Sequence, residues 1–339
     1  MDTWLCDAAK HVGPAPRLYW TGCFGRVLPT GTPEGTRRDP ITQFAVAHGG
    51  AASSSMDRDG PEAACRLALD AMARGGSPLQ AAVAGCSLLE DDPRFNAGTG
   101  SNLRLDGKTI EMDASCMTSD GKYGAVACIR DVRNPVQVAA LVHSTPHNLL
   151  VGEGAIAFAR AHGHTPYDPF TPEARRRYDE VRKVLRLAKV QAEEYAWDMT
   201  SLALNWNYPQ DIKSMLGDSD TVGVLTTDGR TFAAASSTGG TISTLLGRVG
   251  DVPLIGCGIY AGPKGAVAVT GAGDFLARQM LSRRIYVELE SGRELPAVLE
   301  EAVHLFPDYV DVGAIALFGP QWAGHSNRDM AWAAARGGP

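Results

Sequence analysis

Three nearby segments in the second half of the chain carry residue types that can perform acyl transfer: Asp220-Thr221-Val222-Gly223, Ser236-Ser237-Thr238-Gly239-Gly240 and Gly247-Arg248-Val249-Gly250-Asp251. A threonine hydroxyl is a weak nucleophile until a base removes its proton. No histidine lies between His164 and His304, but an α-amine on Thr221 itself could be that base if the preceding bond were cut. The residues therefore favour Thr221 as an N-terminal nucleophile, and a histidine brought close by the fold stays the alternative.

The sequence around this threonine predicts the strands that would position it. Val222 to Leu225 and Phe232 to Ala235 flank Thr227-Asp228-Gly229, a typical hairpin turn. We therefore expect Thr221 at the start of one strand and Thr238 at the end of its neighbour, side by side. A further strand, 266–269, leads into Thr270-Gly271-Ala272-Gly273-Asp274, whose glycines are a weak phosphate-loop signal because the Lys-Ser/Thr of a P-loop is missing.

The remaining elements follow from apolar periodicity, caps and breakers. A strand at 44–47 runs into His48-Gly49-Gly50-Ala51, which either lies beside a site or is only a tight strand exit. Short strands are expected at 103–105, 109–112, 123–129 and 312–318, the last of which would complete the ordered chain. Helices are expected at about 61–74, 78–92, 134–142, 150–162, 274–284 and 294–304, and strands followed by helices with little strict alternation favour stacked layers.

Composition and charge limit the possible functions. The chain has 339 residues, of which 44% are hydrophobic and 21% charged, enough for one large core or two modest ones. A net charge of -6 gives no general attraction for nucleic acid, and no apolar run approaches the roughly 18 residues of a membrane span. Seven cysteines without a C-x-x-C pair argue against a disulfide framework, and with no secretion signal or sequon we expect a cytoplasmic protein.

Domain organisation is expected to be simple. Residues 1–42 are rich in Pro, Gly, Arg and Thr and are expected to be a poorly ordered N-terminal extension. Residues 43–339 would be one catalytic domain, in which 164–220 is a linker that holds the cut site accessible. The linker carries a helix with seven basic residues between Arg175 and Lys189, and a solvated helical face is favoured there over a nucleic-acid surface.

Together these segments resemble the threonine-dependent asparaginase family of N-terminal nucleophile hydrolases, which includes isoaspartyl peptidase/L-asparaginases and glycosylasparaginases. The resemblance covers about 43–320 and also rests on His48-Gly49-Gly50-Ala51, Leu89-Glu90-Asp91-Asp92-Pro93, Phe95-Asn96-Ala97-Gly98, Met112-Asp113-Ala114 and Asn134-Pro135. It implies an α+β fold, a four-layer αββα sandwich. It also implies a precursor that cuts itself between Asp220 and Thr221 into an α part to 220 and a β part, 221–339, which form a homodimer of cleaved αβ units.

The resemblance also implies a role for each site residue. Thr221 matches the nucleophile and Thr238 the threonine that hydrogen-bonds to it. Arg248 matches the clamp for the substrate's α-carboxylate, because a planar guanidinium gives a bidentate grip, and Asp251 matches the acceptor for its α-ammonium. Thr270 and Gly271 match the oxyanion hole, and Gly273 matches a backbone position that contacts the substrate. Asn96 matches a supporting site residue; the alternative is that it only braces a glycine-rich loop.

No catalytic cofactor is implied, but a structural ion is. The segment from Leu89 to Thr99 matches a loop that binds sodium in bacterial and plant members through main-chain carbonyls, here those of Leu89, Glu90, Asp92, Phe95, Ala97 and Thr99. From the residues alone, the carboxylates of this segment do not have the spacing of a calcium loop.

Two departures from the family pattern make the sub-family mixed. Asp220 stands at a cut position that is Gly in plant-type enzymes and Asp in glycosylasparaginases, and Ala52 replaces a usual Gly of the first glycine turn. The resemblance implies hydrolysis of the β-aspartyl amide bond of L-asparagine and isoaspartyl dipeptides through a β-aspartyl ester. Glycosylasparaginase activity is the alternative, and a non-catalytic binding or scaffold protein is a minor one.

Overall fold

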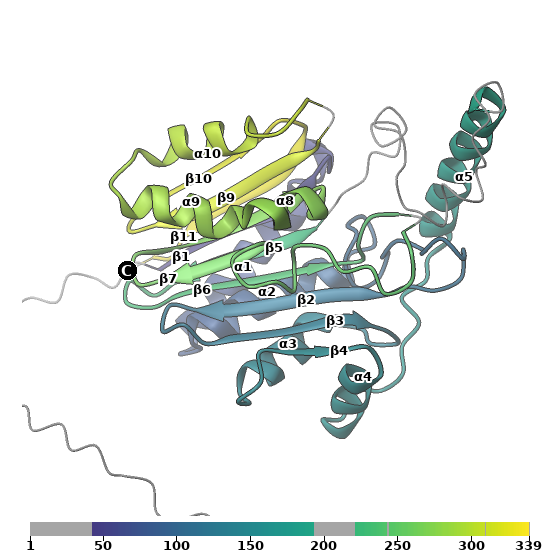
Figure 1. Cartoon of the computed structure of the whole chain (residues 1–339). Coiled ribbons are helices and arrows are strands. Elements are labelled where there is room, and N and C mark those ends of the chain that lie inside the picture. Colours follow the sequence, from purple (N-terminus) through teal and green to yellow (C-terminus); the bar gives the residue numbers. More distant parts are fainter. Residues whose placement is uncertain (1–42, 193–220, 243, 309, 339) are drawn as a thin grey trace, which may run out of the picture. The chain divides into compact units, whose positions relative to one another are not determined.

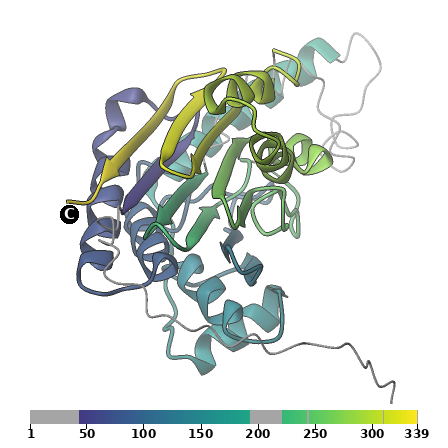
Figure 2. The same cartoon turned by 90° about the vertical axis from the view of Figure 1, so that its left-hand side faces the viewer.

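The structure is a computed structural model that describes residues 43–192, 221–242, 244–308 and 310–338. These residues belong to one unit, Pro40–Pro339, and Figures 1 and 2 show its elements from two directions. The expectations for 1–42, for linker residues 193–220 and for the Asp220 side of the cut bond lie outside the described residues.

Two β-sheets form the centre of the fold. The larger sheet has seven strands in the spatial order β11 (Met330–Arg336), β1 (Phe44–Ala51), β5 (Val222–Thr227), β6 (Phe232–Thr238), β2 (Met112–Thr118), β3 (Tyr123–Ile129) and β4 (Leu149–Val151). The smaller sheet has four, in the order β10 (Gln321–Ser326), β9 (Val312–Phe318), β8 (Gly265–Gly271) and β7 (Ile259–Gly262). Neighbouring strands are antiparallel except β3 and β4.

Helices cover the sheets on their outer faces. α1 (Asp59–Ala73), α2 (Pro78–Asp91) and α3 (Pro135–His143) pack on the larger sheet, and α4 (Gly152–Ala161) packs beside β3 and β4. α9 (Leu281–Glu290) and α10 (Leu295–Val303) pack on the smaller sheet, α8 (Gly273–Gln279) follows β8 directly, and α5 (Pro172–Ala192) lies in the linker. A 3-10 turn, Ser55–Asp57, precedes α1. The fold class is therefore α+β, as the sequence predicts.

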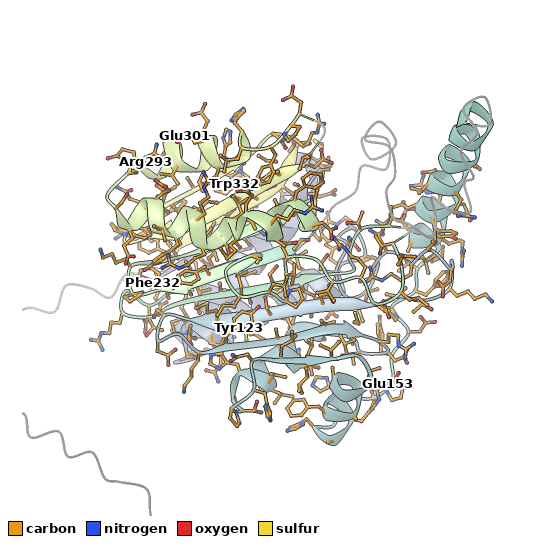
Figure 3. All side chains as sticks on the ribbon, in the orientation of Figure 1. Tyr123, Glu153, Phe232, Arg293, Glu301 and Trp332 are labelled. Carbon is orange, nitrogen blue, oxygen red and sulfur yellow. The ribbon has the colours of Figure 1, made fainter. Side chains whose placement is uncertain are left out.

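The two-residue period of the strands separates the hydrophobic cores. Along β1, Ala45 and Ala47 belong to the cluster beneath α1 and α2, whereas Phe44 and Val46 belong to the cluster between the two sheets. Tyr123 and Phe232, labelled in Figure 3, lie in this second cluster. Strand β5 is covered on both faces, and the residues at its start are therefore held in a fixed place.

Local sequence explains why the elements begin and end where they do. The hydroxyl of Ser77 accepts the N–H of Gln80 at 3.2 Å, and the amide oxygen of Gln80 accepts the N–H of Ser77 at 2.8 Å, so a capping box starts α2. The predicted Asp-Gly hairpin between β5 and β6 is confirmed, with Val222 opposite Ser237. At Met280 the backbone turns left-handed, with φ 44°, and this ends α8 and separates it from α9.

Three sequence predictions are wrong in detail. Residues 103–105 and 109–111 are not strands, because the carboxylate of Asp106 accepts the N–H groups of Lys108 and Thr109 and fixes a turn there. The helix predicted to end at 284 is interrupted at Met280 and then runs to Glu290. The strand at 312–318 is not the last regular element, because β10 and β11 follow it. Alanine has a low strand propensity, so the alanine-rich β11 forms a strand through its pairing with β1.

Helix α5 contains the predicted basic segment and docks on the loop that follows Gly98. The guanidinium of Arg175 donates to the carbonyl of Gly107 at 2.6 Å, and the hydroxyl of Tyr178 donates to the carbonyl of Leu105 at 2.9 Å. Tyr178 is buried by this contact. Part of the basic face therefore serves packing.

In the part of the chain that the structure describes, no helix combines the length and apolar character of a membrane-spanning segment. The cysteines of this part are free and buried: Cys65, Cys86, Cys116, Cys128 and Cys257. Burial raises the pKa of Cys65 and Cys116 to about 12, so these thiols stay protonated at neutral pH and are poor nucleophiles.

Candidate active site

Two threonine hydroxyls meet where β5 begins and β6 ends. Thr221 directly precedes β5, and the antiparallel register with β6 brings it beside Thr238. The two Oγ1 atoms are 3.2 Å apart and hydrogen-bonded, and both residues are buried. Thr238 Oγ1 also accepts the N–H of Gly240 at 3.0 Å. The hairpin thus holds one hydroxyl against another in a fixed orientation.

These threonines line a pocket with an empty volume of about 220 Å³. The ends of β5, β6 and β8 and the loop after β6 supply its walls, which comprise Thr221, Thr238, Gly240, Thr241, Arg248, Gly250, Asp251, Gly271 and Gly273. Residues far apart in the sequence that were predicted to share a site are therefore brought together. Thr270 and Asn96 were also predicted, and they lie behind this lining.

Arg248 and Asp251 form the charged side of the pocket. The side chain of Arg248 is 8% exposed, and its Nη2 donates to the carboxylate of Asp274, in the first turn of α8, at 2.7 Å. A Cβ on Gly250 would lie 2.8 Å from Arg248 Nη1, and one on Gly273 would lie 2.6 Å from Asp251 Oδ1. The two glycines are needed because they let the charged side chains pack directly on backbone.

The carboxylate of Asp251 is placed where it could receive a cation. Burial raises its pKa from 3.8 to about 7; the nearby Arg248 opposes the rise, and Asp274 adds to it. Its Oδ2 has no hydrogen-bond partner among the described residues. A buried acceptor oxygen without a donor is costly, so a ligand with an ammonium group would satisfy it.

The end of β8 supplies a threonine and a strained glycine. Thr270 is fully buried, and its Oγ1 accepts the N–H of Ala51 at 3.0 Å. Gly271 has φ +135°, and a Cβ there would lie 2.0 Å from the carbonyl oxygen of Asp311. Only glycine fits this turn, which exposes Gly271 backbone to the pocket. The bond from Ala51 also places the His-Gly-Gly-Ala turn beside the site.

The departure at Ala52 has a structural consequence. Ala52 has φ 84°, in the left-handed region that favours glycine. Its N–H donates to the carbonyl of Asp329 at 2.8 Å, which holds the turn in place. Alanine therefore occupies a strained position next to the turn that contacts Thr270.

Asn96 braces the loop after β6. Its Nδ2 donates to the carbonyl of Gly240 at 2.8 Å, and its own carbonyl accepts the N–H of Gly239 at 2.9 Å. Its Oδ1 accepts the N–H of Asn102 at 2.9 Å. These contacts favour the bracing interpretation of Asn96, because Gly240 lines the pocket and Asn96 does not.

His48 is a site residue whose position the sequence did not reveal. It lies on β1 opposite Gly223 of β5, is fully buried, and faces the backbone of Thr221. Burial lowers the pKa of His48 to about 3 although the contact with the Thr221 backbone favours protonation, so the ring is neutral at physiological pH. A Cβ on Gly223 would lie 2.3 Å from its Nε2. The imidazole ring thus packs on the backbone of β5 at Gly223, one strand position beyond Val222.

The loop from Leu89 to Thr99 contains the main-chain carbonyl oxygens that were predicted to bind a cation. Its carbonyls at Glu90 and Asp92 accept the N–H groups of Thr99 and Phe95, at 2.8 and 3.1 Å, and each keeps a second lone pair. Carbonyl oxygens are ligands of hard cations, and a sodium ion in this loop stays a prediction. Within the described residues, no group of three His, Cys, Asp or Glu side chains could hold a metal ion.

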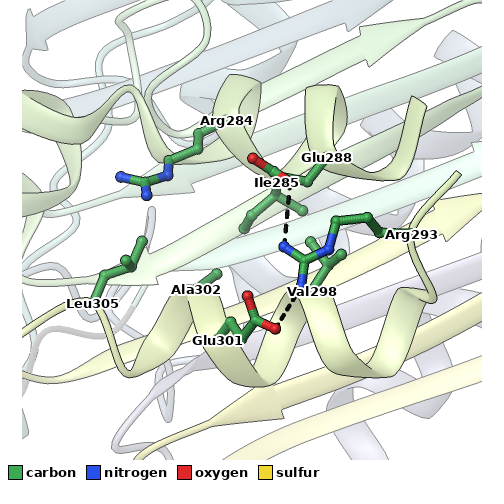
Figure 4. A pocket seen from close by; sticks show the side chains of 8 residues that line it. All are labelled: Arg284, Ile285, Glu288, Arg293, Val298, Glu301, Ala302 and Leu305. Atoms are coloured by element: carbon green, nitrogen blue, oxygen red, sulfur yellow. Dashed lines mark hydrogen bonds and ion pairs between the residues drawn. The ribbon is translucent and has the colours of Figure 1, made fainter. Parts of the chain in front are cut away.

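A second pocket lies between α9 and α10, away from these residues, with an empty volume of about 310 Å³ (Figure 4). Arg293 crosses it, with ion pairs to Glu288 and Glu301. Its remaining lining is Arg284, Ile285, Val298, Ala302 and Leu305. Although this pocket is larger, it contains no nucleophile, so the smaller pocket is the candidate active site.

Comparisons with known proteins agree with one another. The family model described as asparaginase matches residues 41–338. The plant-type L-asparaginase of Pyrococcus furiosus is 40% identical over 253 residues, which is 74% of this chain and 76% of that protein. The isoaspartyl peptidase/L-asparaginase of Danio rerio is 35% identical over 311 residues (86% and 92%), and that of Bos taurus is 36% identical over 312 residues (88% and 94%).

Proposed function

We propose, from the premise that the chain belongs to the asparaginase family of enzymes, that it hydrolyses the β-aspartyl amide bond of L-asparagine and of isoaspartyl dipeptides. The names of the relatives support this activity. The observation that carries the proposal is the 3.2 Å contact between the Thr221 and Thr238 hydroxyls in a pocket that also contains Arg248 and Asp251. A nucleophile and two groups suited to a free amino-acid end thus share one cavity.

Thr221 becomes the nucleophile after the bond to Asp220 is cut. Its hydroxyl oxygen attacks the Asp220 carbonyl, the peptide shifts from nitrogen to oxygen, and water opens the ester. The freed α-amine has an ordinary pKa of about 7.7 to 8.0, near enough to neutrality to accept the hydroxyl proton. Cleavage yields an α part to 220 and a β part from 221, held together in a four-layer αββα fold of the N-terminal nucleophile type.

Substrate is held by the charged side of the pocket. Arg248 grips the α-carboxylate through its guanidinium fork, and Asp251 accepts the α-ammonium with the oxygen that has no other partner. Thr270 lies at the end of β8, beside Gly271, where its Oγ1 accepts the N–H of Ala51. With the backbone at Gly271 it would stabilise the oxyanion, and the backbone of Gly273, which lines the pocket, would contact the substrate.

In the reaction, Thr221 Oγ1 bonds to the side-chain carbonyl carbon and its α-amine takes the hydroxyl proton. The tetrahedral intermediate collapses, the amide C–N bond breaks, and the leaving nitrogen takes the proton from the amine. Ammonia or an amino acid departs and leaves a β-aspartyl ester on Thr221. Water, deprotonated by the same amine, then attacks the ester carbonyl. The bond from this carbon to Thr221 Oγ1 breaks, the oxygen takes the proton back from the amine, and aspartate is released. Before attack the Thr221 hydroxyl donates to Thr238 Oγ1. Once the Thr221 proton has moved to the amine, the Thr238 hydroxyl would donate to the Thr221 oxygen.

The proposal also covers assembly, cellular location and bound ions. The cleaved αβ units pair as a homodimer in the cytoplasm, and the carbonyls of the Leu89 to Thr99 loop hold a structural sodium ion. No catalytic cofactor takes part. The donor set of the loop supports the ion, because the Glu90 and Asp92 carbonyls each retain a lone pair.

Glycosylasparaginase activity is the second candidate, because Asp220 is the residue found at the cut position of that group. The test is aspartate release by the cleaved protein from L-asparagine, a β-aspartyl dipeptide and a sugar-linked asparagine. We expect hydrolysis of the first two. Activity on the sugar-linked compound alone would favour the second candidate, and no hydrolysis of any would favour a scaffold protein.

A further inference from the structure

A fully buried arginine lies directly behind the substrate pocket, on the segment between Asn96 and β2. Arg104 is 0% exposed, which is rare for a residue of this charge. Its Nη1 donates to the hydroxyl of Thr244 at 2.6 Å, and its Nη2 donates to the carbonyls of Glu111 at 3.0 Å and Arg248 at 3.3 Å. The guanidinium thus reaches the loop that carries the proposed carboxylate clamp.

Glu111 completes this anchor. Its carboxylate lies 3.3 Å from Arg104 Nε and accepts the N–H of Gly247 at 2.7 Å. The backbone adds a third tie, because the N–H of Leu105 donates to the carbonyl of Thr244 at 2.7 Å. The residues before Arg248 are thereby fixed to one buried ion pair.

The guanidinium also touches the other wall of the pocket. A Cβ on Gly240, which lines the pocket, would lie 2.7 Å from Arg104 Nη1. The backbone of Gly240 adopts φ +73° at this point of close approach. One side chain therefore supports both the loop after β6 and the loop that bears Arg248. A buried ion pair is weak evidence for stability, so its geometry calls for another explanation.

We propose that Arg104, with Glu111 as its counter-ion, is a positioning residue that aims Arg248 at the α-carboxylate of the substrate. This inference rests on the proposed function, since it assigns Arg248 to that carboxylate. Arg104 does not line the pocket and acts only through the 240–248 loop. A charge-assisted hydrogen bond to a carboxylate depends on the position of its donor, so loosening this loop should weaken recognition of the carboxylate specifically.

The test uses cleaved full-length Arg104→Gln and Arg104→Lys, with the milder Thr244→Val in case the first does not fold. Arg175→Gln is the matched control, because the guanidinium of Arg175 likewise donates to a backbone carbonyl, that of Gly107, which is outside the 240–248 loop. Each protein is assayed for KM and kcat on L-asparagine. Calorimetry then compares binding of L-aspartate with that of β-alanine, which is aspartate without its α-carboxylate.

We expect Arg104→Gln to raise KM and the aspartate Kd about ten- to hundredfold, the size of one hydrogen bond to a charged group, with kcat within about threefold and β-alanine binding unchanged. Arg104→Lys should recover part of the loss, Thr244→Val should shift KM in the same direction, and Arg175→Gln should match the wild type. Equal loss of aspartate and β-alanine binding, or a fall in kcat with KM unchanged, would overturn the inference.

Failure of the proposed function would look different. A wild type that hydrolyses no β-aspartyl compound would reject that function. Arg104 is then judged by calorimetry alone: weaker aspartate binding by Arg104→Gln supports the positioning role, and equal or absent aspartate binding in both proteins rejects it.

Discussion

Replacing Asp251 with asparagine should change how catalysis depends on pH. The substitution keeps the side chain's shape and removes the charge that we propose binds the substrate's α-ammonium. Burial raises the pKa of Asp251 from 3.8 to about 7, with Arg248 opposing and Asp274 adding to the rise. A carboxylate holds an ammonium group at full strength only when ionised, so substrate capture should require loss of a proton from Asp251 near pH 7.

The size of the effect follows from that pKa. A hydrogen bond to a charged group contributes about 1.5 to 3 kcal/mol, which corresponds to about 10- to 150-fold in kcat/KM at pH 9, where Asp251 is ionised. At pH 5 a carboxyl group with a pKa near 7 is only about 1% ionised. The advantage of the wild type over Asp251→Asn should therefore fall toward unity at pH 5. An ordinary pKa of 3.8 would leave the advantage nearly intact there.

The assay is kcat/KM for L-asparagine from pH 5 to pH 9 in both proteins. The Thr221 amine titrates in the same direction, but it is present in both proteins and cancels when their values are divided. A ratio that stays constant across this range would refute the reasoning, because Asp251 would then either have an ordinary pKa or not contact the ammonium.

Three other substitutions give separate expectations. Arg248→Lys keeps the charge but loses the planar guanidinium fork, so KM for asparagine should rise about 10- to 150-fold. Electrophoresis should still show a cut chain. A KM equal to that of the wild type would mean that another residue binds the α-carboxylate. Burial raises the pKa of Glu90 from 4.5 to about 8, so the wild type loses stability as the pH rises from 4.5 to 8. In thermal unfolding, Glu90→Gln should be about as stable as the wild type near pH 5 and more stable by up to about 5 kcal/mol at pH 9. The same dependence of stability on pH in both proteins would contradict this. Gly271→Ala should destabilise by about 3 kcal/mol or more because its Cβ would lie 2.0 Å from a backbone oxygen. The control Gly292→Ala also has a positive φ, +93°, but open space around it, so it should have a markedly higher unfolding temperature than Gly271→Ala.

Local signals predicted the elements that carry the hydroxyl pair. The Asp-Gly turn fixes the hairpin, and the hairpin register alone puts Thr221 beside Thr238, so their contact was foreseeable. Capping residues likewise predicted α2. These predictions succeed because each depends on residues within one turn or one strand pair.

Contacts between distant segments were not foreseeable in the same way. Nothing near Arg248 in sequence indicates its ion pair with Asp274, and the motif containing His48 does not reveal that the ring faces the backbone of Thr221. Strand β11 was missed because alanine-rich segments have low intrinsic strand propensity and form strands here through pairing with β1. The break at Met280 was missed because a left-handed methionine has no sequence signal.

The central claim is that Thr221 is a nucleophile created by cleavage of the bond before it, and N-terminal sequencing of the purified protein tests it most directly. Denaturing electrophoresis should separate two fragments, and the smaller should begin Thr-Val-Gly-Val. Thr221→Ala should give one uncut, inactive chain, because the hydroxyl is required both for cleavage and for turnover. Full activity from an intact wild-type chain, or a smaller fragment beginning at another residue, would contradict the account.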